Sequence, residues 1–212
     1  MDIVSGQVPN DINGVYLRNG PNPKYIPGEH LHHWFDGDAM IHAIRIKNGK
    51  LYYCNRYIMS PRFKYECEQG RSVFPRIGEM TCLAGILKMP LSLVGGLVGY
   101  YKNFGILENG TPNTAFAHHQ KKTYALVENN LPFNIKIDRD KNGESFDILS
   151  IGHDDFGGQL QHAVSAHPKV NRKTGELFAF CYSIRKPAVD YTLFNRDRKA
   201  ILNIQIPLKP PH

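Results

Sequence analysis

Hydrophobic and polar residues alternate along much of the chain with the two-residue period of half-buried β-strands. The clearest case is a hairpin, in which residues 40–46 and 51–57 flank Asn48 and Gly49. Asn-Gly readily adopts the two positive φ angles of a type I′ turn, the strongest short-range hairpin signal. We predict further strands at residues 14–18, 123–127, 133–137, 146–151, 176–184 and 201–207. Short antiparallel strands of this kind indicate an all-β sandwich, barrel or propeller, and the pattern does not choose among them.

The stretch from Leu83 to Tyr101 departs from this alternation, because it is strongly apolar and Lys88 is its single charged residue. Its length approaches the roughly 20 apolar residues that a membrane-spanning helix needs. Lys88, Pro90 and several glycines weaken a spanning helix. We therefore expect a short apolar helical insertion that is either buried or lies at a membrane interface.

The composition agrees with a globular β protein. The 212 residues are 42% hydrophobic and 21% charged, which provides enough apolar material for a core. The chain also has 19 Gly, 14 Pro, 11 Tyr and 11 Phe, which suit turns and strands better than a helical bundle.

The formal net charge of +7 raises the question of a nucleic-acid partner. Lys and Arg are scattered singly or in pairs rather than gathered in a dense cluster. We therefore predict no nucleic-acid binding, and interpret the charge as a basic surface that further chain would partly balance.

The cysteines show neither a CxxC motif nor close pairing, so we predict free, partly buried thiols in a reducing compartment. They are Cys54, Cys67, Cys82 and Cys181. The first residues show no basic and apolar leader. We expect the protein in the cytosol, or in a plastid if its N-terminus has been lost.

The histidines are the candidate metal ligands, because neutral imidazole binds iron, zinc, copper and nickel. They are His30, His32, His33, His42, His118, His119, His153, His162, His167 and His212. On a strand, His30 and His32 would face one side, as a chelate requires, but spacing alone favours a loop role. His118 and His119 would face opposite sides, so they cannot reach one ion.

Two carboxylate positions leave alternatives open. Asp36-Gly37-Asp38 looks like part of a calcium loop but lacks the later ligands, so a turn bonded to backbone amides or an Arg is favoured. Glu128 follows an apolar strand and is either a solvated strand end or an inward-pointing group; the residues alone favour the former. The sequence has no GxSxG motif, P-loop or dinucleotide fingerprint, which leaves the common nucleophile and phosphate chemistries without support.

Four blocks in order carry a family resemblance. They are NGVYLRNGPNP at residues 13–23, HWFDGDAMIH at 33–42, the stretch 114–132 with its AL-x-E and Leu-Pro, and AHPKV followed by TGEL at 166–177. Together they resemble the carotenoid oxygenase family over nearly the whole chain.

The resemblance implies a seven-bladed β-propeller that holds Fe(II) on its axis through four histidines. Members cleave a conjugated double bond of a carotenoid or apocarotenoid with O2. The motif match implies that His167 is the first iron ligand. It also implies that Glu128 accepts an N–H from an iron-bound imidazole, which orients that ring. The segment from Leu83 to Tyr101 falls where members contact one membrane leaflet.

Departures from the family pattern are few until the end of the chain. Ala39 replaces a usual Gly, at a cost of about 1 kcal/mol if the position needs a positive φ. Asn171 and Arg172 replace a usual Asp-Pro. The chain stops before the second ligand motif. We therefore expect residues 1–212 to form the N-terminal portion of a propeller that is inactive alone. The alternative is a non-catalytic truncated product or a lipid- or partner-binding propeller fragment.

Overall fold

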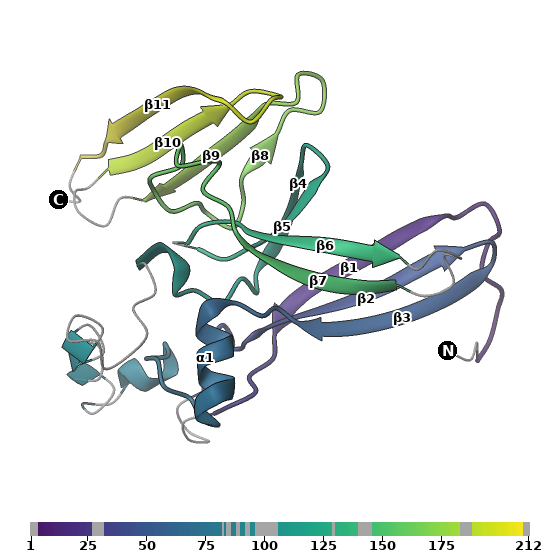
Figure 1. Ribbon diagram of the computed structural model, residues 1–212, viewed down its shortest axis with the longest axis horizontal. Helices are drawn as coiled ribbons and strands as arrows, with labels where there is room; N and C mark the ends of the chain where they lie inside the picture. Colours follow the sequence, from purple (N-terminus) through teal and green to yellow (C-terminus); the bar gives the residue numbers. More distant parts are fainter. Residues whose placement is uncertain are drawn as a thin grey trace.

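The computed structural model describes residues 4–26, 32–81, 106–128, 130–139, 146–182 and 188–209, together with positions 83, 86, 87, 90, 91, 94 and 95. The described strands form three antiparallel sheets that follow one another along the chain (Figure 1). The first sheet contains β1 (Gly14–Pro21), β2 (Ala39–Lys47) and β3 (Lys50–Tyr57).

The predicted hairpin is confirmed as β2 and β3. Lys47 pairs with Lys50, and Asn48 and Gly49 between them have φ angles of 49° and 73°. These positive angles are those of a type I′ turn, whose twist suits paired strands.

The second and third sheets each contain four strands in sequence order. The second contains β4 (Ala115–His119), β5 (Lys122–Leu126), β6 (Phe133–Arg139) and β7 (Phe146–His153). The third contains β8 (Lys169–Val170), β9 (Leu177–Tyr182), β10 (Ala188–Phe194) and β11 (Ala200–Pro207). Strands are present at all six further predicted places, although residues 183 and 184 of one prediction lie outside the described residues.

Three strands, β4, β8 and β10, were not predicted from the sequence, and each omission has an identifiable reason. β8 is two residues long, and β4 leads into a turn at Gln120 and Lys121, which take positive φ angles without any glycine. In β10, the polar Thr192 is fully buried because its hydroxyl bonds to His162 Nε2 at 2.7 Å. A buried polar residue disrupts the alternation that a sequence pattern relies on.

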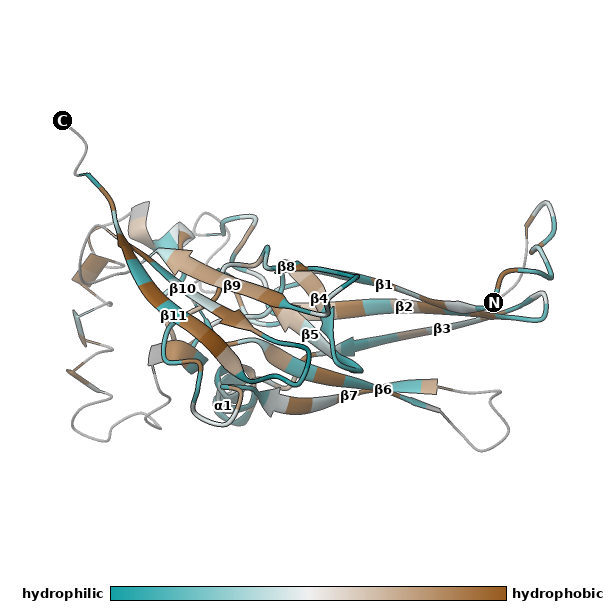
Figure 2. Cartoon of the chain, turned by 90° about the horizontal axis from the view of Figure 1, so that it is seen from above, coloured by the Kyte–Doolittle hydropathy of each residue, from teal (hydrophilic) through white to brown (hydrophobic). Residues whose placement is uncertain are grey.

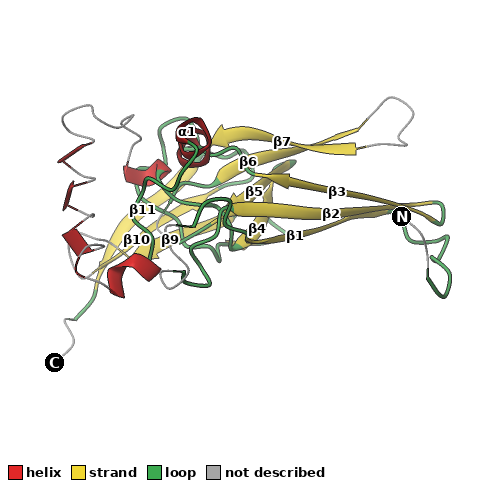
Figure 3. Ribbon diagram, turned by 90° about the horizontal axis from the view of Figure 1, so that it is seen from below, coloured by secondary structure: helices red, strands yellow, loops and turns green. Residues whose placement is uncertain are grey.

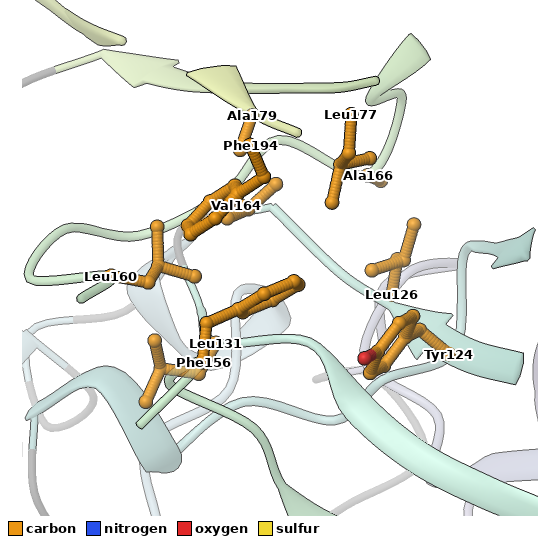
Figure 4. Packing of buried hydrophobic residues seen from close by; sticks show 10 residues of the cluster. All are labelled: Tyr124, Leu126, Leu131, Phe156, Leu160, Val164, Ala166, Leu177, Ala179 and Phe194. Atoms are coloured by element: carbon orange, nitrogen blue, oxygen red, sulfur yellow. The ribbon is translucent and has the colours of Figure 1, made fainter. Parts of the chain in front are cut away.

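The sheets stack through two hydrophobic cores, one on each face of the middle sheet. Tyr124 and Leu126 of β5 point into the core shared with the third sheet, where Phe156 stacks on Phe194 with ring centroids 4.2 Å apart (Figure 4). Ala125, between them, points into the core shared with the first sheet. Successive strand residues face opposite sides. Both faces of the middle sheet therefore contribute residues to a hydrophobic core, as in a stack of propeller blades.

The chain is mostly β, as expected, and it also contains the helix α1 (Pro61–Gln69), which follows β3 in the chain and lies near the end of β7 in Figure 3. Ser60 caps its start by accepting the Phe63 N–H, Pro61 opens its first turn, and Gly70 ends it with a φ of 65°. Ser before Pro at a helix start and Gly past its end are recognised signals. Short 3₁₀ turns occupy Gly78–Thr81 and Ile106–Glu108.

The apolar stretch from Leu83 to Tyr101 lies mostly outside the described residues. Its described positions, 83, 86, 87, 90, 91, 94 and 95, are helical. None of the helices in the described part of the chain is long and apolar enough to cross a membrane.

Candidate metal-binding site

Two loops from different sheets bring His167 and Glu128 together. His167 lies just ahead of β8, and Glu128 follows β5. The imidazole Nε2 and the carboxylate Oε1 are 3.8 Å apart, and the side chains are 63% and 50% exposed. Both side chains thus lie on the same side of the structure and can be reached from outside.

The hydroxyl of Ser165 lies between these two residues. It donates to Glu128 Oε1 at 3.3 Å and accepts the backbone N–H of His167 at 3.2 Å. Ser165 is buried, and its own backbone N–H bonds to the carbonyl of Phe180 in β9 at 2.7 Å. The loop that carries His167 is therefore fixed against the third sheet.

Backbone contacts hold the two loops side by side. Val164 donates its N–H to the carbonyl of Asn130 at 2.9 Å, and the two residues form an isolated antiparallel bridge. Gly110 packs so closely here that a Cβ would press into the side chains of Asn130 and Val127. A residue larger than glycine at position 110 would therefore disturb the loop that carries Glu128.

The pair fits part of a ferrous site rather than a whole one. An imidazole supplies a nitrogen that iron accepts, and a neighbouring carboxylate is the usual partner for a ligating imidazole. Among the described residues, however, no group of three His, Cys, Asp or Glu side chains is placed to hold a metal ion. Further ligands would have to come from chain beyond this pair.

The other histidines considered as ligands have different surroundings. His30 lies outside the described residues, and His32 and His33 are exposed. His118 is exposed and bonds to the Thr123 hydroxyl, whereas His119 is buried and bonds to the Gly175 carbonyl at 2.9 Å. The prediction that His118 and His119 face opposite sides of a strand is confirmed.

The Asp36-Gly37-Asp38 segment is a turn held by hydrogen bonds, as the sequence favoured. Asp36 accepts the backbone N–H groups of Ile77 and Gly78 at 2.6 Å, and Asp38 accepts that of Lys24 at 2.9 Å. Burial raises the pKa of the Asp38 carboxyl despite that hydrogen bond and the neighbouring Arg76. Both oxygens of Asp36 and one oxygen of Asp38 therefore accept hydrogen bonds that hold this turn.

Sequence reasoning missed the ion pair that anchors this turn. The side chain of Arg76 bonds to the backbone carbonyl of Asp36 and to Glu66 of α1, at 3.1 Å from Glu66 Oε2. Both charged side chains are at least 98% buried. No local sequence motif indicates such a pair, because Arg76 and Glu66 become neighbours only after α1 packs beside the turn.

The departures from the family pattern cause no visible strain. Ala39 is buried in β2 and does not take a positive φ, so the expected cost of replacing glycine does not arise. Asn171 opens a turn in which its side-chain oxygen accepts the N–H of Lys173 at 3.0 Å. Of the predicted free thiols, Cys54 and Cys181 are buried, Cys67 is partly buried, and none of these three forms a disulfide.

The stacked sheets and the histidine–carboxylate pair define a mostly β protein of the propeller type. The family model described as retinal pigment epithelial membrane protein (RPE65) matches residues 1–212. The chain therefore belongs to this family, that of the carotenoid oxygenases.

Curated relatives agree with this assignment. The chain is 38% identical over 195 residues to carotenoid 9,10(9′,10′)-cleavage dioxygenase 1 of Pisum sativum, covering 92% of this chain and 34% of the relative. It is 36% identical over 207 residues to a protein of Arabidopsis thaliana named probable carotenoid cleavage dioxygenase 4, chloroplastic, covering 97% of this chain and 33% of that protein. The chain thus spans about a third of the length of the curated relatives it matches.

A solved structure confirms the fold. The lignostilbene dioxygenase of Pseudomonas brassicacearum superposes with a TM-score of 0.68 at 26% sequence identity. The match covers 95% of this chain and 37% of that enzyme.

Proposed function

We propose that this chain is the N-terminal portion of an enzyme that cleaves a conjugated double bond of a carotenoid or apocarotenoid with O2. Fe(II) would be held by His167 together with imidazoles from other parts of the propeller. The observation that carries the proposal is the approach of His167 and Glu128 to 3.8 Å from loops of two different sheets. The membership of the family and the relatives named for carotenoid cleavage support it.

Each residue of the pair would have a distinct task. His167 would supply an imidazole nitrogen, and the exposure of its ring leaves that nitrogen accessible. Glu128 would accept an N–H from an imidazole and so fix its tautomer and orientation. The iron, when bound, supplies the chemistry of O2; the protein orients its ligands and the polyene.

We further propose that the complete propeller has seven blades and that residues 1–212 supply its first sheets. The edge strand β11 supports further packing, because Leu202, Ile204 and Ile206 alternate along it and so lie on one face, and Figure 2 colours much of this strand as hydrophobic. Ile201, Leu202, Ile204 and Ile206 are each at least 41% exposed. Apolar surface on an open edge strand is normally covered by another element.

We also propose that the stretch from Leu83 to Tyr101 contacts a membrane peripherally, which would give access to a lipid-soluble substrate. Leu83, Leu87, Leu91 and Val94 are helical and more than half exposed. Their spacing of three and four residues places them on one face of a helix. The compartment would be a plastid or the cytosol; the chloroplastic name of the Arabidopsis relative favours the plastid.

His167→Ala in the full-length gene product tests the metal assignment. We expect the variant to lose its iron, and its cleavage rate to fall at least about 100-fold. Removing a residue that only orients a ligand typically lowers metal affinity or activity tenfold to 100-fold, and removing the ligand itself should cost more. Iron per chain is measured by elemental analysis, and substrate loss by chromatography.

His118→Ala serves as the matched control, because His118 is also exposed but bonds to Thr123. Normal iron content and cleavage in the His167 variant would refute the assignment. Residues 1–212 expressed alone should show no turnover in the same assay; turnover would contradict the proposed dependence on further ligands. The alternative, a non-catalytic lipid- or partner-binding product, would be supported if the full-length protein held no iron.

A further inference from the structure

The hydroxyl of Ser165 makes hydrogen bonds to both members of the candidate metal-binding pair. A serine hydroxyl has one donor and two acceptor sites, so it can donate to Glu128 and accept from the His167 N–H at the same time. The two contacts measure 3.3 and 3.2 Å. One buried oxygen thus joins a carboxylate of the second sheet to a loop of the third.

Ser165 is better fixed than either residue that it contacts. It is 9% exposed and its backbone N–H bonds to Phe180 of β9. By contrast, Glu128 and His167 have exposed side chains with little packing to hold them. An exposed carboxylate loses rotamer freedom when it is held in one place, so a fixed donor such as the Ser165 hydroxyl is needed to define its position.

We infer that Ser165 is a positioning residue that sets the Glu128 carboxylate and the His167 loop in the geometry that the ferrous site requires. The inference rests on the proposed function and deepens it. The hydroxyl engages one oxygen of the carboxylate and leaves the other, Oε2, available for the N–H of an imidazole. It also restrains the backbone from which the His167 ring extends.

Three variants of the full-length gene product test this role. Ser165→Ala removes the hydroxyl, and Ser165→Thr retains it. Ser60→Ala is the matched control, because Ser60 is also buried and its hydroxyl also accepts a backbone N–H, that of Phe63 at 3.2 Å, at the start of α1. The control thus loses a comparable hydrogen bond without touching the pair.

Two measurements are made on each variant. Residue-resolved hydrogen exchange reports on the backbone amide of His167, and titration with Fe(II) reports on metal affinity. We expect Ser165→Ala to speed exchange at His167 about tenfold, the effect of losing one ordinary hydrogen bond. We also expect it to weaken Fe(II) binding about tenfold, at the lower end of the range for groups that orient ligands. Ser165→Thr should restore both, and Ser60→Ala should change neither.

Wild-type Fe(II) affinity in Ser165→Ala would overturn the inference, even with faster exchange, because the hydroxyl would then serve the loop alone. An equal loss of Fe(II) affinity in Ser60→Ala would also overturn it, since general destabilisation would explain the effect. Failure of the proposed function is recognised separately, by unchanged Fe(II) binding in His167→Ala. In that case, exchange at His167 still shows whether the hydrogen bond to Ser165 forms.

Discussion

At the scale of single residues, two neighbours at the end of β7 show that hydrogen-bond and charged partners decide whether burial changes a pKa. Burial lowers the pKa of His153 to about 4, and its ring lies edge-on to Phe133 with centroids 5.0 Å apart. Burial alone would raise the pKa of the next residue, Asp154. Hydrogen bonds from Lys122, the Phe156 amide and Tyr124, with the charge of Arg198, outweigh burial and lower that pKa.

The low pKa of His153 predicts a loss of stability in mild acid. Between pH 6.5 and about 4 the unfolded state binds a proton that the folded state does not, so the free energy of unfolding decreases as the pH falls. The contribution of His153 to the free energy of unfolding is fully present above pH 6.5 and is lost by pH 4. Its size is up to about 3 kcal/mol.

Urea unfolding at pH 7 and pH 4.5 measures this effect, with His153→Gln as the comparison because a neutral amide does not titrate in this range. The variant should lose less stability than the wild type between the two pH values. An identical loss in both proteins would show that His153 does not contribute.

At the scale of elements, close approach as well as hydrogen bonding fixes the Asp36–Asp38 turn. A Cβ on Gly37 would press into backbone atoms of Pro21 and Asn22 at the end of β1. From the other side, the amide of Asn113 donates to the Gly37 carbonyl at 2.7 Å. The turn therefore joins the end of the first sheet to the start of the second.

Gly37→Ala should lower the free energy of unfolding by about 1–3 kcal/mol, because backbone atoms cannot move aside as a flexible side chain would. Gly20→Ala is the matched control, since a Cβ there would meet no heavy atom within 4 Å. We expect the control to change stability by less than about 0.5 kcal/mol. Equal denaturant midpoints for the two variants would contradict the explanation.

At the scale of the whole molecule, charged side chains as well as hydrophobic cores hold successive sheets together. Asp154, after β7, bonds to Arg198 of the β10–β11 turn at 2.6 Å and to Lys122 at the start of β5 at 2.9 Å. The Arg198 guanidinium also lies over the ring of Phe156, 4.7 Å from its centroid. This cluster joins the second sheet to the third.

The proposed membrane contact also belongs to the whole molecule. Leu87→Glu combined with Leu91→Glu in the full-length gene product should reduce binding to phosphatidylcholine–phosphatidylglycerol vesicles at least about tenfold, because each buried leucine contributes roughly 1.5–3 kcal/mol. Flotation with the vesicles measures the bound fraction.

The control for vesicle binding replaces two apolar residues elsewhere, Val4→Glu with Ile12→Glu, which are 100% and 46% exposed. The control should bind like the wild type. Equal vesicle binding by the two double variants would show that the helical stretch has no particular membrane role.

The sequence by itself determined what depends on near neighbours along the chain. Asn48 and Gly49 fixed the β2–β3 hairpin because their backbone preferences are local. The caps of α1, Ser60 and Gly70, are equally local, so the missed helix could have been found. The four motif blocks identified the family, as the comparison over residues 1–212 confirms.

Only the tertiary structure decided which distant residues meet. Glu128 and His167 are separated in the sequence by β6, β7 and a long loop, and they approach because the second sheet packs against the third through a shared hydrophobic core. The same packing places the Ser165 hydroxyl between them and pairs Arg76 with Glu66. Such contacts depend on how sheets stack, and no local pattern of residues encodes that arrangement.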